Sequence, residues 1–202
     1  MCGIIGAINS QNILDNSRFN EALNLMRSRG PDASDQWNDN LCKLGHRRLS
    51  ILDLSNKGNQ PMVSHNKRYV CVLNGEIYNY NDLKKELSKN NINWKSTSDT
   101  EVLLEGYSHW GKSLLEKIDG MFAFCIWDRK ENQLFGARDR IGEKPLYYHL
   151  GDRSFAFASR PTPIFKMLPN LSTELDIQGL RLYLESGYFP FPYTFHKNIK
   201  KI

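Results

Sequence analysis

The sequence predicts an α+β fold in which antiparallel strands and helices lie in layers. Short apolar runs recur along most of the 202 residues, and their lengths are typical of strands in antiparallel sheets. Polar turns at residues 129–132 and 151–153 join neighbouring runs into hairpins, and only a few amphipathic helices lie between the runs. A doubly wound parallel sheet needs a helical crossover between successive strands, so the pattern favours a layered α+β sandwich.

The first part of the chain is expected to form three strands and three helices. The first helix has Ser17 as its N-cap and ends at the Gly-Pro pair 30–31. A capping box of Ser98 and Glu101 starts the third helix. The Asn-Gly pair 74–75 is a strong hairpin signal and predicts a turn after the third strand. The strands are expected at residues 2–8, 42–51 and 68–75, and the helices at residues 17–30, 81–90 and 98–111.

The second part is expected to add four strands and one helix. After residue 159 the chain changes character, because Pro161 and Pro163 are expected to disrupt the start of a helix. We place one domain at residues 1–171 and treat residues 172–202 as a connector toward a further domain. The strands are expected at residues 121–128, 133–139, 145–150 and 154–159, and the helix at about residues 176–186.

Composition and charge exclude several classes of protein. Apolar residues make up 40% of the chain and charged residues 24%, which is ordinary for a globular domain. The net charge of +5 is scattered rather than concentrated on one helix, so no nucleic-acid partner is expected. No apolar segment is long enough to span a bilayer, and the first apolar run ends at Asn9, too early for a signal peptide. We expect a cytoplasmic protein that does not bind membranes.

The four cysteines lie at positions 2, 42, 71 and 125, without a CxxC pair or a Cys/His cluster of zinc-ligand spacing. No metal site is therefore expected. Cys71 and Cys125 lie inside apolar runs and are interpreted as inert core thiols. This usage of cysteine suits a reducing compartment better than secretion.

Cys2 stands directly behind Met1 and ahead of an apolar run. Removal of Met1, expected before so small a residue, would place a thiol and a free α-amine on the same residue. A thiol has a pKa of about 8.5 and an α-amine one of about 8, so such a residue carries its own general base. This is the logic of N-terminal-nucleophile enzymes. The alternative is an ordinary buried cysteine at the start of a strand.

Five further stretches combine charged residues with turns. Each has a structural explanation by itself, since Asp99 suits the first turn of a helix, Glu76 can cap a turn and Arg48 can lie on a solvated strand face. Only their combination with Cys2 favours a functional site. The stretches are RSRGPD (27–32), GHRRLSILD (45–53), LNGEIYN (73–79), STSDTE (96–101) and RDRIGEKPLYY (138–148).

Taken together and in order, these motifs with MCGIIGAI and DGMFAF closely resemble the glutaminase domain of class II glutamine amidotransferases, asparagine-synthetase type. The resemblance runs from residue 1 to about residue 159. It implies a four-layer αββα N-terminal-nucleophile fold with two stacked antiparallel sheets. It also implies hydrolysis of the L-glutamine side-chain amide, with ammonia passed to a C-terminal synthetase domain.

The resemblance also assigns catalytic roles. Cys2 would be the nucleophile that forms a γ-glutamyl thioester, with its own amine carrying the proton. The side-chain amide of Asn74 and the backbone N–H of Gly75 would form the oxyanion hole, which glycine suits because no Cβ blocks the approach. Arg29 would have a supporting role close to the nucleophile.

Three residues are assigned to the amino-acid end of glutamine by the same resemblance. Arg48 would hold the α-carboxylate, for which a bidentate guanidinium is well shaped. Glu76 and Asp99 would hold the α-ammonium.

Two departures from the family pattern concern the second domain. Relatives continue the strand at residues 154–159 with Ser-Glu, whereas this chain has Ser159-Arg160-Pro161, which alters the surface that faces the synthetase partner. The nucleotide-binding pattern Ser-Gly-Gly-x-Asp-Ser is not in the sequence. No cofactor is therefore expected in this chain, and ATP and Mg²⁺ belong to a synthetase domain outside it. A homodimer and the acceptor of the ammonia are left open, and a non-catalytic glutamine-binding or regulatory module is the alternative function.

Overall fold

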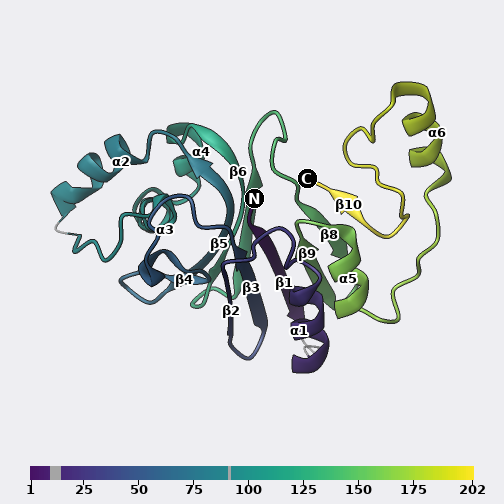
Figure 1. Cartoon of the computed structure of the whole chain (residues 1–202), viewed down its shortest axis with the longest axis horizontal. Coiled ribbons are helices and arrows are strands. Elements are labelled where there is room, and N and C mark those ends of the chain that lie inside the picture. Colours follow the sequence, from purple (N-terminus) through teal and green to yellow (C-terminus); the bar gives the residue numbers. More distant parts are fainter. Residues whose placement is uncertain (10–14, 91) are drawn as a thin grey trace.

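The structure is a computed structural model and describes residues 1–9, 15–90 and 92–202. Two antiparallel sheets form its centre, which confirms the predicted α+β fold (Figure 1). The first sheet contains β1 (Gly3–Asn9), β2 (Ala33–Asn38), β3 (Cys42–Arg48), β8 (Tyr147–Leu150), β9 (Ser154–Ala158) and β10 (Lys200–Lys201), in the order β10-β8-β9-β1-β3-β2. The second contains β4 (Met62–Val63), β5 (Tyr69–Ile77), β6 (Gly120–Asp128) and β7 (Gln133–Arg138), in the order β4-β5-β6-β7.

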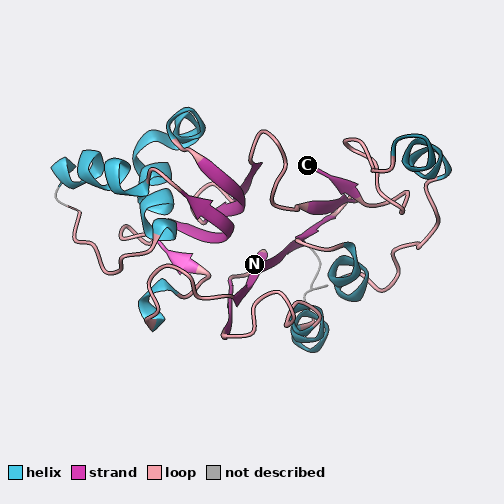
Figure 2. Cartoon of the chain, turned by 45° about the horizontal axis from the view of Figure 1, so that its top comes forward, coloured by secondary structure: helices cyan, strands magenta, loops and turns pink. Residues whose placement is uncertain are grey.

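Helices cover the outer face of each sheet (Figure 2). The first sheet packs against α1 (Asn16–Asn24) and α5 (Pro161–Met167), and the second against α2 (Tyr80–Leu87), α3 (Asp99–Trp110) and α4 (Leu114–Lys117). Helix α6 (Ile177–Ser186) lies apart from both layers, with Gly179 as its one buried residue in the described structure. The 3₁₀ turns are Asn56–Gly58, Ser88–Asn90 and Gly111–Ser113.

The strands build three apolar layers because successive side chains point to opposite faces. On β5, Val70 and Val72 pack between the two sheets, whereas Cys71 and Leu73 pack against the helices of the second sheet. Strands β1 and β6 alternate in the same way. The result is the predicted order of helices, sheet, sheet and helices.

The segment from residue 172 onward returns to the first sheet. Strand β10 pairs antiparallel with β8, and Ile199 is fully buried beside β1 and α5. The main chain of Ile202 donates to the carbonyl of Leu146 (3.0 Å). The domain boundary between residues 171 and 172 stays a prediction, and this segment contributes one strand to the sheet.

Two helix ends differ from the expectations. Helix α1 has Asp15 as its N-cap, because its carboxylate accepts from the main chain of Ser17 (2.8 Å), and the helix ends at Asn24 rather than at residue 30. Ser98 caps α3 as expected, but Glu101 does not close a capping box. Its carboxylate accepts instead from the main chain of Ser96 (2.7 Å) and contacts the ring of His65 (2.8 Å), because the loop before α3 folds over it.

Two further expectations were wrong for reasons of pairing and position. Asn74 and Gly75 form no turn but lie within β5, opposite Ala123 and Phe122 of β6, since an unbroken ladder outweighs the local turn preference. Pro161 does not disrupt a helix but is the first residue of α5, where its fixed φ and missing N–H cost nothing.

In the described part of the chain no helix is long and apolar enough to cross a membrane. Within the same residues no group of three His, Cys, Asp or Glu side chains is arranged to hold a metal ion. The thiols of Cys42, Cys71 and Cys125 are buried and free, and burial raises the pKa of each. Cys71 and Cys125 are therefore core thiols, as predicted.

Candidate active site

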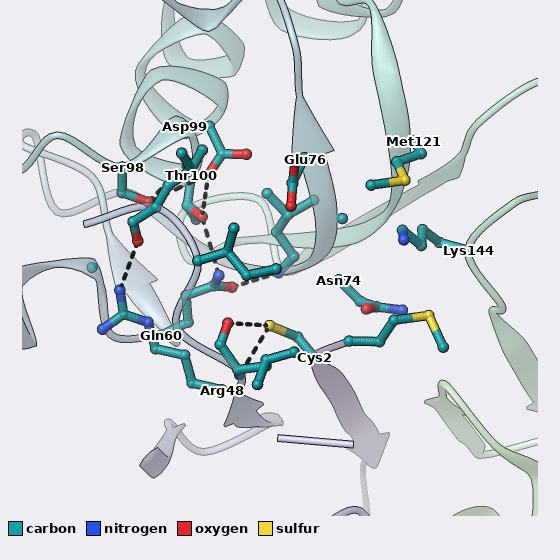
Figure 3. A pocket seen from close by; sticks show the side chains of 17 residues that line it. Cys2, Arg48, Gln60, Asn74, Glu76, Ser98, Asp99, Thr100, Met121 and Lys144 are labelled. Carbon is teal, nitrogen blue, oxygen red and sulfur yellow. Dashed lines mark hydrogen bonds between the residues drawn. The ribbon is translucent and has the colours of Figure 1, made fainter. Parts of the chain in front are cut away.

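A cavity of about 210 Å³ opens where the two sheets meet (Figure 3). Its wall is formed by the residues ahead of β1, the end of β3 and the loop that follows it, the second half of β5, the first turn of α3 and the beginning of β6. The structure brings six of the seven residues predicted for the site to this wall, which are Cys2, Arg48, Asn74, Gly75, Glu76 and Asp99. The seventh, Arg29, contacts the main chain of Cys2 from outside the cavity, where its Nε donates to the Cys2 carbonyl (2.9 Å).

Cys2 precedes β1, and the pairing of Gly3 with Arg47 places it beside the end of β3. Its Sγ accepts from the main chain of Leu49 (3.4 Å). Burial raises the pKa of the Cys2 thiol, although the Leu49 hydrogen bond and nearby positive charges act against this. A thiol with a raised pKa needs a base to take its proton when it attacks.

Asn74 and Glu76 reach the cavity because of the register of β5. They continue the face of the strand that carries Val70 and Val72, and this face points toward the first sheet and Cys2. The Asn74 side chain is fully buried, and neither its Nδ2 nor its Oδ1 has a hydrogen-bond partner among the described residues. Since buried amides are nearly always paired, this one is placed to bind a ligand atom.

Gly75 lies between these two residues and points the opposite way. A Cβ at this position would collide with the carbonyl oxygen of Met121, so the tight approach of β5 to β6 requires glycine. This accounts for the glycine through packing. Its part in an oxyanion hole stays a prediction.

Arg48 ends β3 and is buried. Its Nη1 donates to the carbonyl of Ser55 (2.7 Å) and to Oδ1 of Asn59 (2.8 Å), and its Nη2 donates to the carbonyls of Leu52 (3.1 Å) and Asp53. The loop of residues 52–59 therefore occupies the four terminal N–H groups and leaves Nε–H as the remaining donor. A bidentate contact with a carboxylate would require these bonds to rearrange.

The two acids lie on the same side of the cavity. Asp99 begins α3, is buried, and accepts from the main chain of Ile77 (2.9 Å). Burial raises the pKa of the Asp99 carboxyl, and the nearby charge of Glu76 adds to this rise, whereas the hydrogen bonds oppose it. Two neighbouring carboxylates disfavour each other's charge, which makes the position favourable for a cation.

Three residues of the site were missed by the sequence reasoning. His46 lies two residues before Arg48 on β3, beside the cavity rather than on its wall, and bonds to the carbonyl of Leu73 (3.2 Å); burial, and more weakly the charge of Arg48, lower its pKa to about 3. Gln60 accepts from the main chain of Leu73 (2.6 Å) and donates to Oγ1 of Thr100 (3.1 Å). Lys144 lies on the cavity wall. His46 and Lys144 belong to motifs quoted above, whereas no local pattern marks Gln60.

Cys2, next to the start of the chain, and the buried Asn74 amide, which is unpaired among the described residues, line one cavity between two antiparallel sheets, as expected for an amidotransferase of the N-terminal-nucleophile type. Residues 1–202 match the family model described as "Glutamine amidotransferase domain", and the chain belongs to this family. The resemblance drawn from the motifs is confirmed.

Curated relatives specify the type. The chain is 36% identical over 206 residues to "Asparagine synthetase [glutamine-hydrolyzing] 1" of Bacillus subtilis (strain 168), in a match covering 100% of this chain and 32% of the relative. It is 36% identical over 221 residues to a putative asparagine synthetase of the same class from Methanocaldococcus jannaschii, covering 100% of this chain and 42% of the relative. The chain thus spans about a third of the length of the curated relatives it matches. It is an amidotransferase domain of the asparagine-synthetase type.

The solved structures agree on the fold. The glutamine phosphoribosylpyrophosphate amidotransferase of B. subtilis, solved with ADP and GMP, superposes with a TM-score of 0.66 and covers 82% of this chain and 43% of its own. The sequence identity is 21%, so this likeness concerns the fold alone.

Proposed function

We propose that this chain hydrolyses the side-chain amide of L-glutamine to glutamate and ammonia. The observation that carries the proposal is the fully buried Asn74 amide, which has no partner among the described residues, on the wall of the cavity that also contains Cys2. A glutamine amide whose carbonyl oxygen bonds to Asn74 Nδ2 would have its carbon in reach of the sulfur.

Removal of Met1 during maturation frees the α-amine of Cys2 before the reaction begins. The amine takes the thiol proton as the sulfur attacks the amide carbon, and the carbonyl electrons move to the oxygen, which Asn74 stabilises. When the electrons return, the C–N bond breaks and the leaving nitrogen takes the proton from the α-ammonium. Ammonia and a γ-glutamyl thioester result. A water molecule, deprotonated by the same amine, then attacks the thioester and releases glutamate and the Cys2 thiol.

The amino-acid end of the substrate would lie on the opposite side of the cavity. Glu76 and Asp99 supply negative charge for the α-ammonium, and the raised pKa of Asp99 would fall once that cation is bound. Arg48 would meet the α-carboxylate through its Nε–H, or through its terminal nitrogens after the loop of residues 52–59 has moved.

The ammonia would serve a second reaction. Relatives named asparagine synthetases are about three times as long as this chain, so a C-terminal synthetase region is the proposed recipient. ATP and Mg²⁺ would belong to that region, and the residues of this chain supply only the hydrolysis. A relative from Gibberella zeae, 42% identical over 129 residues, is named "Amidase chry2" and matches 63% of this chain. The asparagine synthetases match the whole chain, so asparagine synthesis is the proposed second reaction.

The test is a steady-state assay of ammonia release from glutamine. Protein whose intact mass shows the loss of Met1 should be active, and Cys2→Ala should reduce the rate to background. Equal rates in the two proteins would rule out the mechanism. Alkylation by 6-diazo-5-oxo-norleucine gives an independent readout, because a non-catalytic binding module would gain no adduct at Cys2.

A second variant separates the thiol from its base. One extra glycine ahead of Cys2 keeps the thiol in place but converts its α-amine into an amide nitrogen, which cannot accept a proton. We expect this protein to bind glutamine and to release almost no ammonia. Full activity would show that another group is the base.

A further inference from the structure

The RDRIGEK stretch places a lysine in the candidate active site. Lys144 is 8% exposed and lines the cavity together with Cys2, Asn74 and Glu76. In Figure 3 its nitrogen is turned into the cavity, on the side away from Arg48 and the first turn of α3. No hydrogen bond or ion pair of its Nζ is found among the described residues, and the nitrogen is not one of the buried unpaired atoms, so the ammonium is accessible from the cavity.

Two side chains hold the turn that carries this lysine. The buried Asp139 carboxylate accepts from the main chain of Glu143 (2.8 Å), Lys144 (3.1 Å) and Phe122 (3.3 Å). The guanidinium of Arg138 donates to the carbonyls of Gly142 and Lys144. A loop fixed at both of its ends by charge-assisted bonds holds its lysine in one place, as a positioned binding group requires.

The position of Lys144 relative to the other charges decides which part of a ligand it meets. Arg48, Asp99 and Glu76 are assigned to the amino-acid end, and the terminal N–H groups of Arg48 already have acceptors. Lys144 lies toward the other end, where Asn74 faces the reacting amide. Besides the Cys2 amine, it is therefore a cation with free donors at the side-chain end of glutamine.

That end of the ligand changes its charge during the reaction. The glutamine amide is neutral, the oxygen becomes negative during attack, and the product carries a γ-carboxylate at the same place. A cation on the cavity wall stabilises the charged species and is nearly indifferent to the neutral one. Because the Lys144 ammonium has no acid partner among the described residues, it is free to pair with an anion that arrives with the ligand.

We propose that Lys144 is the residue that binds negative charge at the side-chain end of the substrate, first on the oxyanion and then on the γ-carboxylate of glutamate. This inference rests on the proposed glutaminase function. It makes Lys144 a determinant of product affinity and of the rate of attack, and it leaves the affinity for glutamine to the residues at the other end.

The test compares the two ligands at equilibrium, where no chemistry intervenes. Titration calorimetry on Cys2→Ala protein gives the Kd of glutamate and of glutamine, and the same background then carries Lys144→Met or Lys144→Arg. We expect Lys144→Met to weaken the affinity for glutamate by about tenfold, as for the loss of one hydrogen bond to a charged group, and to change the affinity for glutamine by less than twofold. Lys144→Arg should recover most of the glutamate affinity.

The matched control is Lys130→Met, which removes the same charge from an exposed position at the far end of β6. It should change neither Kd. Retained glutamine binding by Lys144→Met shows that the variant is folded. In protein with an intact Cys2 and Met1 removed, Lys144→Met should lower kcat with little change in KM.

Two results would overturn the assignment. Equal weakening of both ligands would mean that Lys144 only supports the fold of the pocket or pairs with Glu76. Unchanged glutamate affinity would mean that it contributes no charge to the ligand. Failure of the proposed function has a different signature, since the parent protein would then release no ammonia and Cys2→Ala would bind neither ligand.

Discussion

Replacing Asn74 by leucine is expected to inactivate the protein and to stabilise it. Leucine has nearly the same size and branching as asparagine, so it should fit the same site on β5. The asparagine amide is fully buried, and both its nitrogen and its oxygen lack protein partners in the described structure. The side chain therefore lowers the stability of the ligand-free protein, whereas its proposed use comes only during the reaction.

The magnitudes follow from the two unpaired atoms. A buried polar group without a hydrogen bond costs about 1–3 kcal/mol, so Asn74→Leu should raise the free energy of unfolding by about 2 kcal/mol. For a domain of this size that corresponds to a Tm higher by roughly 4–8 °C. Loss of one oxyanion-hole donor should lower kcat by about 100- to 1,000-fold.

Asn79→Leu is the matched control for this experiment. The Asn79 amide is fully used, because its Nδ2 donates to the carbonyl of Lys117 (2.8 Å) and its Oδ1 accepts from the main chain of Asp119 (3.0 Å). This substitution should lower the Tm and leave the rate of ammonia release almost unchanged. If Asn74→Leu also lowered the Tm, or kept more than a tenth of the parent kcat, the reasoning about the unpaired amide would be refuted.

Three further predictions concern the surroundings of the cavity. Gly58→Ala should raise the KM for glutamine several-fold and lower the Tm, because a Cβ there collides with Nη2 of Arg48 and disturbs its hydrogen bonds to the loop of residues 52–59; an unchanged KM would argue against Arg48 as a ligand. His46 has a pKa of about 3 in the folded state against an ordinary 6.5, so the unfolded chain binds more protons between these values and stability rises with pH. Urea unfolding at several pH values gives the free energy of unfolding as a function of pH. Between pH 4 and 6 this free energy should rise less steeply for His46→Gln than for the parent protein, by up to about 1.4 kcal/mol per pH unit, and equal slopes would contradict a neutral buried histidine. Asp139→Ala removes the acceptor of three main-chain N–H groups and should lower the free energy of unfolding by about 1–3 kcal/mol, with a larger loss of glutamate than of glutamine affinity; a purely global effect on both ligands would contradict its role in holding Lys144.

The sequence could predict which side chains of β5 share one face of the strand, but not how long the strand is. Val70 and Val72 alternate with residues of the other face, and the same period continues to Asn74 and Glu76. The Asn-Gly pair interrupted this reading because it is a strong local turn signal. Only the pairing with β6, about fifty residues later in the chain, shows that the strand continues.

The contacts of Arg48 depend on a fold-back that no local pattern reveals. The family resemblance assigned Arg48 a bidentate contact with a carboxylate, but the carbonyls of Leu52, Asp53 and Ser55 and the side chain of Asn59 already accept from its guanidinium. Gln60 escaped notice for a similar reason. It joins β5 to α3 through Leu73 and Thr100, and such a link between elements distant in sequence leaves no spacing to recognise.

Arg138 connects the far end of the described chain to the pocket. Its guanidinium donates to the carbonyl of Ile202 (2.5 Å) with one nitrogen and to the carbonyls of Gly142 and Lys144 with the others. Displacing residue 202 by about an ångström would strain the hydrogen bonds of Arg138 to the carbonyls of Gly142 and Lys144, which hold the turn of Lys144 in place. Hydrogen exchange at the Lys144 amide would report such a displacement, because Arg138 links residue 202 to the turn that carries Lys144.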